Sequence, residues 1–229
     1  MIDRFVAAAV TGFARFVTGV RANWVGCLPD PRPRIYFANH TSHGDFVLIW
    51  SVLPGAVRAL TRPVAGADYW LKDRFRRFIG ENVFHAVLID RNAQAREADP
   101  IGHMVSVLDA GQSLIFFPEG TRNTTEAALL PFKTGIHHLA RARPGVELVP
   151  VWIDNLNRVM PKGEFIPIPL LCTVTFGTPI KLAADEDRPA FNCVAASTSA
   201  SPHEIGSNLP FTFFMGDCRR SSCSIKSNA

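Results

Sequence analysis

Short apolar runs with the length of buried strands recur through the middle of the chain. They occupy residues 34–37, 57–61, 84–90, 113–117, 147–153 and 171–176. Helical segments lie between them: one near residue 46 ends at Pro54-Gly55, one runs from Asp99-Pro100 to Gly111, and one covers residues 135–143. Strands that alternate with helices predict an α/β fold, with a layered, largely parallel and partly mixed sheet flanked by helices.

Residues 1–22 place apolar side chains at helical spacing, with Arg4, Thr11, Arg15 and Thr18 on the other side. At about 1.5 Å per residue this helix would just span a bilayer, but Arg15 near its middle would cost about 2.5–3.5 kcal/mol. We therefore expect an amphipathic helix in the membrane interface. A helix that covers the protein's own core is the alternative. A signal peptide is disfavoured because Arg15 interrupts its apolar region.

Composition narrows the classes of partner. The chain of 229 residues is 47% apolar, contains 17 Phe, and carries a net charge of +4 with a pI near 9.0. This charge suits an anionic membrane surface, anionic substrates or nucleic acid, and no DNA-binding or RNA-binding motif supports the last. Five cysteines without C-x-x-C spacing indicate neither a disulfide framework nor a zinc site. No metal constellation is evident, and we expect no cofactor.

Cations alternate with aromatic residues between positions 69 and 80. This pattern suits a surface for anionic headgroups or for a nucleotide-bearing acyl donor. A solvated helix whose aromatic residues face the core explains it equally well.

A polar stretch at residues 38–45 separates an apolar strand from an apolar helix, and α/β folds place chemistry at the carboxyl ends of strands. His40 and Asp45 would lie about 140° apart on an ideal helix, so they do not share one helix face. We expect His40 in the loop and Asp45 in the first helical turn, with Gly44 allowing the turn and the carboxylate orienting the imidazole.

Three further segments accompany this one in a fixed order. They are Val87-Leu88-Ile89-Asp90-Arg91, Phe117-Pro118-Glu119-Gly120-Thr121-Arg122 and Val149-Pro150-Val151. Together with Asn39-His40-x4-Asp45 they resemble the four motifs of the H-x4-D glycerolipid acyltransferases of the lysophosphatidic acid (1-acyl-sn-glycerol-3-phosphate) acyltransferase type. H-x4-D alone is a weak signal, whereas F-P-E-G-T-R after an apolar strand is specific. The resemblance covers roughly residues 34–182.

The resemblance assigns the general base to His40, held by Asp45, whereas the residues alone leave His43 as a competing base. Arg91 and Arg122 both follow apolar strands, and guanidinium groups match phosphate oxygens, so both are candidates to bind the acceptor's phosphate. A structural salt bridge, for instance with Asp90 or Glu119, is the alternative.

The remaining candidates for substrate binding surround Arg122. Gly120 and Thr121 would offer backbone N–H groups and a hydroxyl to the same phosphate. The resemblance implies that Glu119 helps to shape the acceptor site, and Lys133 fits the family's pattern downstream. No G-x-S-x-G nucleophile elbow is present, which favours direct attack without an acyl-enzyme.

These features predict an enzyme that transfers a fatty acyl group from acyl-CoA or acyl carrier protein to the free hydroxyl of 1-acyl-sn-glycerol 3-phosphate. We expect it at the cytoplasmic face of a membrane as a peripheral protein. Glycerol 3-phosphate or another lysophospholipid would be a different acceptor for the same chemistry. A thioesterase or lipase-like hydrolase would use the His-Asp pair on water, and a non-catalytic protein would bind anionic lipids without turnover.

We expect three parts along the chain. Residues 1–28 would form the membrane-interface helix, and a stiff proline-rich connector at 29–33 would lead into an acyltransferase catalytic domain at 29–191. Residues 192–229 show almost no apolar periodicity and lack the further helix that the family supplies. We expect them to be largely disordered, or an atypical end of the chain.

Overall fold

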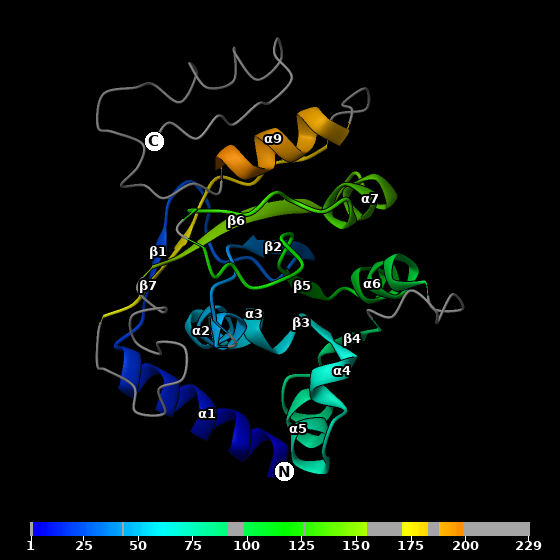
Figure 1. The fold of residues 1–229 in the computed structure, drawn as a ribbon. Helices are drawn as coiled ribbons and strands as arrows, with labels where there is room; N and C mark the ends of the chain where they lie inside the picture. The colour runs from blue at the N-terminus through cyan, green and yellow to red at the C-terminus, as the bar shows by residue number, and fades with distance from the viewer. Residues whose placement is uncertain are drawn as a thin grey trace.

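The computed structural model describes residues 2–42, 44–90, 99–125, 127–154, 171–182 and 188–198. Within these residues the chain forms a 7-stranded sheet in the order β1-β7-β6-β2-β5-β3-β4 (Figure 1). The strands are β1 (Arg21–Trp24), β2 (Arg34–Ala38), β3 (Thr61–Gly66), β4 (Val87–Ile89), β5 (Ser113–Phe116), β6 (Glu147–Asp154) and β7 (Thr173–Phe176). Every neighbouring pair is parallel except β6 and β7, so the predicted mixed α/β sheet is confirmed.

Helices cover both faces of this sheet. They are α1 (Ile2–Thr18), α2 (Asp45–Val52), α3 (Gly55–Ala59), α4 (Ala67–Trp70), α5 (Arg74–Phe78), the π-helix η1 (Ile79–Val83), α6 (Pro100–Asp109), α7 (Gly135–Ala142) and α9 (Arg188–Thr198). Tyr36 and Ala38 of β2 face a core built with α2, whereas Ile35 and Phe37 face one built with α6, α7 and α9. Alternate residues of the central strand therefore serve two apolar layers, which is why all five are buried.

Helix α6 begins and ends where the sequence predicts. The side chain of Asp99 accepts a hydrogen bond of 2.9 Å from the Gly102 N–H, Pro100 is the first helical residue, and Gly111 has a φ of +78°. A carboxylate cap, a proline at the first position and a glycine beyond the last turn are the usual signals of helix ends.

Three predictions about the backbone are corrected by the structure. The strand expected at residues 57–61 is the short helix α3, and strand β3 begins only at Thr61. Strand β1 follows α1 directly and pairs with β7, so the domain boundary expected at residue 28 divides a single sheet. Helix α9 crosses the boundary expected at residue 192, and its Phe191 and Ala195 are fully buried. Residues 199–229 lie outside the described residues.

The expected N-terminal helix is confirmed as α1, and it has two distinct faces. Ala7, Val10, Ala14 and Val17 pack on the core beside α2. The opposite face leaves apolar side chains in solvent: Ile2, Phe5, Phe13 and Phe16 are 67–89% exposed. Among the described residues, no helix is long and apolar enough to cross a bilayer.

The basic and aromatic stretch at 69–80 folds as α4, α5 and the start of η1. Trp70 packs edge-on against Phe46 and Phe84, so this aromatic ring faces the core. Phe75 is 73% exposed, and the guanidinium of Arg76 lies 4.5 Å from the centre of the Tyr69 ring. The stretch thus combines a core-facing side with an exposed side of cations and aromatic rings.

Candidate functional site

The segments that follow β2 and β5 meet at one edge of the sheet. These strands are parallel neighbours, with Phe37 opposite Phe116, so their carboxyl ends lie at the same level. The β2 end delivers His40 and the β5 end delivers Phe117 to Arg122. Val149 and Val151, from the fourth motif, are buried in the adjacent strand β6 and serve the core.

The structure brings His40 and Asp45 together. Asp45 is the first residue of α2 and is fully buried, and its Oδ2 lies 2.8 Å from His40 Nδ1. Because a carboxylate only accepts hydrogen bonds, the imidazole donates from Nδ1 and keeps Nε2 as an acceptor. The His40 side chain is 17% exposed, so its ring remains within reach of a substrate.

Asp45 Oδ2 also organises the loop that carries His40. It accepts the backbone N–H of Thr41 at 2.6 Å and that of Ser42 at 2.9 Å. One oxygen therefore collects three hydrogen bonds, two from the backbone and one from the ring. The ring orientation and the loop conformation are fixed by the same atom.

Glu119, one of the predicted substrate-binding residues, lies buried against the loop that carries His40. It is only 1% exposed, its Oε1 accepts the His40 N–H at 2.8 Å, and its Oε2 accepts the Leu130 N–H at 2.9 Å. Burial raises the pKa of this carboxyl above its usual range, while the two backbone N–H groups act in the opposite direction. Both oxygens are thus engaged inside the protein.

Two asparagines that the sequence analysis does not assign a role hold the same region. Asn39 is buried, and its side-chain amide bonds both to the Ile153 carbonyl at 3.1 Å and to the Ile153 N–H at 2.8 Å. The backbone N–H of Asn123 donates to the His40 carbonyl at 2.6 Å. In the sequence Asn39 precedes His40, and Asn123 follows the F-P-E-G-T-R segment. This proximity to the motifs is the sequence signal by which the two asparagines could have been identified.

The F-P-E-G-T-R segment forms a tight turn. The Gly120 N–H donates to the Phe117 carbonyl at 3.0 Å, and Gly120 has a φ of +67°, a backbone region that favours glycine. The Lys133 side chain lies so close that a Cβ at Gly120 would meet its Cδ at 2.7 Å and its Nζ at 2.9 Å. The Gly120 N–H, a candidate to bind phosphate, is therefore used in the turn, and Lys133 lies over that turn.

Arg122 is half-buried and close to this turn. In the described part of the chain its guanidinium makes no hydrogen bond or ion pair, and Glu119 binds backbone groups instead. A structural salt bridge between Arg122 and Glu119 is thus not formed. Thr121 is exposed beside it. Arg91 and His43 lie outside the described residues.

The ring of His40 stacks on Phe117, with 4.3 Å between centroids and 25° between planes. This contact holds the imidazole from the side of the third motif, while Asp45 holds it from α2. Among the described residues, no group of three or more His, Cys, Asp or Glu side chains is placed to hold a metal ion. The arrangement therefore supplies a positioned, partly exposed imidazole and, on the neighbouring connection, a guanidinium that no described residue pairs, which suits proton abstraction next to an anionic group.

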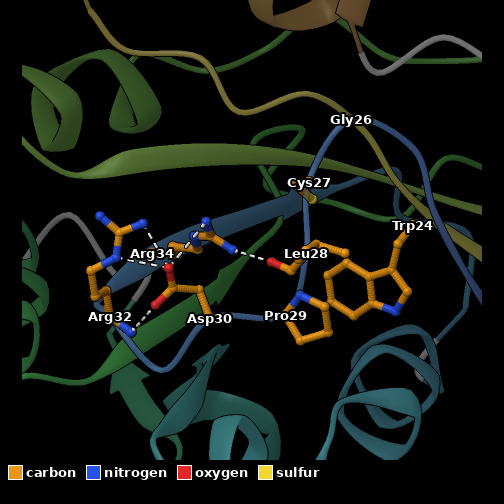
Figure 2. A pocket seen from close by; sticks show the side chains of 8 residues that line it. All are labelled: Trp24, Gly26, Cys27, Leu28, Pro29, Asp30, Arg32 and Arg34. Carbon is orange, nitrogen blue, oxygen red and sulfur yellow. Dashed lines mark hydrogen bonds and ion pairs between the residues drawn. The ribbon is translucent and has the colours of Figure 1, made fainter.

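A hollow lies at the opposite, amino end of β2. Its volume is about 560 Å³, and it is lined by Trp24, Gly26, Cys27, Leu28, Pro29, Asp30, Arg32 and Arg34 (Figure 2). Arg34 forms ion pairs with Glu147 at 2.8 Å and with Asp30 at 3.7 Å, and it donates to the Leu28 carbonyl. The Arg32 guanidinium beside Asp30 lowers the pKa of that carboxyl to about 2. The cations here are neutralised within the protein, which fits a structural network.

Comparison with known proteins gives a consistent result. A family model described as Acyltransferase matches residues 26–154, more than half of the chain. The 1-acyl-sn-glycerol-3-phosphate acyltransferase of Limnanthes douglasii is 29% identical over 178 residues, covering 75% of this chain and 58% of that protein. The enzyme of the same name from Salmonella typhimurium is 34% identical over 130 residues, covering 54% of this chain and 47% of that protein. The chain thus spans about half the length of these relatives.

A solved structure shares the fold. The crystal structure of the 1-acyl-sn-glycerophosphate acyltransferase PlsC from Thermotoga maritima matches with a TM-score of 0.66 and 19% identity, covering 91% of this chain and 83% of that one. At this level of identity the match concerns the fold alone.

Proposed function

This chain belongs to the acyltransferase family, and we propose that it transfers a fatty acyl group from a thioester donor to the free hydroxyl of 1-acyl-sn-glycerol 3-phosphate. The observation that carries the proposal is the hydrogen bond of 2.8 Å between His40 Nδ1 and Asp45 Oδ2, at the strand edge where the third motif also ends. The names of the related proteins support the choice of acceptor.

The reaction follows from the position of the imidazole. His40 Nε2 accepts the proton of the acceptor hydroxyl while the hydroxyl oxygen attacks the thioester carbonyl carbon. The carbon–sulfur bond of the tetrahedral intermediate then breaks, and the proton passes from His40 to the thiolate. The ester product and the free thiol leave, and His40 returns to its neutral form.

Asp45 acts on the charge that develops during this reaction. The imidazole becomes an imidazolium in the transition state, and the buried carboxylate at 2.8 Å from Nδ1 stabilises that cation. The same hydrogen bond keeps the proton on Nδ1 beforehand. His40 Nε2 is therefore ready to accept a proton in each cycle.

Direct attack by the acceptor fits the environment of Ser42, the serine two residues after His40. Ser42 is buried, and its Oγ accepts the Gly44 N–H at 3.3 Å. It is thus a loop-stabilising residue, and an acyl-enzyme on it is not part of the proposal. The guanidinium of Arg122, which no described residue pairs, is the proposed contact for the acceptor's phosphate, with Thr121, Lys133 and Arg91 as further candidates.

The donor and acceptor both carry long apolar chains, so we place the reaction at a membrane surface. The exposed apolar face of α1 supports this, because four large side chains in solvent cost free energy that burial in lipid would recover. We propose peripheral binding at the cytoplasmic face, where acyl-CoA or acyl carrier protein would be available as the donor.

One assay tests the proposal directly. The purified protein in detergent is offered 1-acyl-sn-glycerol 3-phosphate, glycerol 3-phosphate and other lysophospholipids, each with acyl-CoA or acyl carrier protein as donor. We expect phosphatidic acid from the first acceptor, and a fall of roughly 10²–10⁴-fold in kcat for His40→Ala. The exposed His103 on α6 provides a matched control, and His103→Ala should keep the wild-type rate.

Two outcomes would contradict this function. Release of free thiol without any acylated lipid would indicate a hydrolase that uses the same pair on water. Binding to anionic lipid without turnover of any donor and acceptor would indicate a binding protein.

A further inference from the structure

Glu119 carries an inference that rests on the proposed function and concerns the site itself. It is a buried carboxylate in the middle of the third motif, where an acceptor contact is expected. A substrate contact needs an oxygen that faces the ligand. Both oxygens of Glu119 are instead used by backbone N–H groups, and its residue exposure is 1%.

The two hydrogen bonds of Glu119 tie together two connections of the sheet. Glu119 and Leu130 both belong to the connection between β5 and α7, whereas His40 belongs to the segment after β2. The two connections are distant in sequence, and they are joined by this carboxylate and by the nearby Asn123, whose N–H donates to the His40 carbonyl. Loss of Glu119 would therefore loosen the loop that carries the base.

The loop after β2 is held in place by hydrogen bonds from its backbone to two carboxylates. Three consecutive backbone N–H groups point at carboxylates: that of His40 at Glu119, and those of Thr41 and Ser42 at Asp45. Each is a hydrogen bond to a charged acceptor, a class worth about 1.5–3 kcal/mol. Glu119 fixes where the His40 backbone lies, and Asp45 fixes which way its ring points.

The chemistry of the side chain explains why a carboxylate stands here. Two N–H donors approach two different oxygens, so the residue must offer two acceptors. Glutamine has one acceptor and one donor, and its NH2 group would face a backbone N–H. Glutamine therefore keeps the size of Glu119 but loses one of its two hydrogen bonds and leaves a buried N–H unpaired.

We propose that Glu119 is a positioning residue, which holds the His40 backbone in place for proton abstraction and does not contact the acceptor. This differs from the acceptor-binding role that the motif resemblance implies. The two roles predict different kinetics. A positioning residue acts on the transition state, whereas a contact to the acceptor also acts in the ground state.

The experiment compares Glu119→Gln with Arg122→Ala in steady-state kinetics, with the acceptor concentration varied at saturating donor. For Glu119→Gln we expect kcat to fall by about 10²-fold, the scale of a misplacement of about 1 Å, with acceptor KM within about twofold of the wild type. For Arg122→Ala we expect the larger change in acceptor KM and the smaller change in kcat. A rise of KM at unchanged kcat in Glu119→Gln, or no change in either constant, would overturn the proposal.

A second variant covers the case in which Glu119→Gln does not fold, as judged by its thermal unfolding. Glu119→Asp keeps two acceptor oxygens and withdraws them by one methylene, so kcat should again fall at constant KM, and a KM effect alone would again contradict the proposal. A chemical readout is independent of turnover. Acylation of His40 by diethyl pyrocarbonate, followed by mass spectrometry, should be faster in Glu119→Gln than in Arg122→Ala, and equal rates would count against positioning.

The two hypotheses fail in different ways. If the wild-type protein acylates no acceptor, the proposed function is wrong, and the labelling rates still decide whether Glu119 holds His40. If the wild type is active and only KM responds to Glu119, the proposed function stands and this inference is wrong.

Discussion

Replacement of Asp45 by asparagine separates two contributions that the carboxylate makes to His40. Asparagine has nearly the same shape, so the change removes charge and leaves the volume of the first turn of α2 intact. Asp45 Oδ2 accepts the N–H groups of Thr41 and Ser42 as well as the ring N–H. Two backbone donors at one position select the amide oxygen there, because an NH2 group would meet both of them.

The magnitude follows from this geometry. With the amide oxygen in place, His40 still donates from Nδ1, and its reactive tautomer is preserved. The substitution then removes only the electrostatic stabilisation of the imidazolium, which is about 4 kcal/mol for unit charges at 4 Å and an effective dielectric constant of 20. At 1.36 kcal/mol for each factor of ten, this corresponds to a fall of up to about 10³-fold in kcat. A variant that also lost the tautomer would fall further, by about 10⁴-fold as in a serine protease.

The assay measures kcat and acceptor KM for Asp45→Asn beside His40→Ala and the wild type, with thermal unfolding of each variant as the control for folding. We expect Asp45→Asn to lie near His40→Ala in kcat, with little change in KM. A kcat within tenfold of the wild type in a folded Asp45→Asn protein would refute the argument, because the imidazolium would then not depend on this carboxylate.

Three further changes test other parts of the molecule. Arg122→Ala should raise acceptor KM with a smaller effect on kcat, and Arg122→Lys should restore only part of the affinity because lysine lacks the planar fork; an effect on kcat alone would contradict phosphate binding. The double change Phe13→Glu and Phe16→Glu should weaken binding to anionic vesicles by about 10²-fold or more, because burial of each ring contributes about 1.5–3 kcal/mol. Leu28→Glu, at an exposed position outside α1, should leave binding unchanged. Equal co-sedimentation of the wild type, the double variant and Leu28→Glu would count against membrane binding through α1. A chain that ends after Phe191 should melt at a lower temperature than one that ends after α9, because the rest of that helix packs on the core; equal melting temperatures would mean that this packing is unimportant.

The main architecture and the central pair are accessible from sequence because local patterns determine them. Buried strands of a parallel sheet are continuous apolar runs, and polar residues at the carboxyl end of such a run mark the site edge. His40 and Asp45 are close in sequence, so a loop and one helical turn bring them together. The N-cap of α6 is equally local, since Asp99 binds a backbone N–H three residues ahead.

What the sequence does not reveal depends on contacts between distant segments. A carboxylate beside an arginine suggests a surface site, and nothing local to Glu119 indicates that the N–H groups of His40 and Leu130 would enclose it. Strand β1 is only four residues long and has exposed polar side chains, and it is a strand because β7 offers it a partner. The residues of α3 predict a strand because five residues are too few to distinguish the two periods.

Helix α1 buries two small polar residues and exposes its large apolar ones. Thr11 and Thr18, which the sequence pattern places on the side away from the apolar residues, are both buried, and each hydroxyl donates to the carbonyl four residues earlier, at 2.8 and 2.6 Å. Arg15 likewise donates to the Ser51 carbonyl of α2. The polar side chains are therefore hydrogen-bonded, the threonines within α1 and Arg15 to α2, while the large aromatic side chains of α1 are exposed. A helix that only covered the core would bury its phenylalanines first. Burial of the threonines in their place is the arrangement expected of a helix whose second partner is a lipid surface.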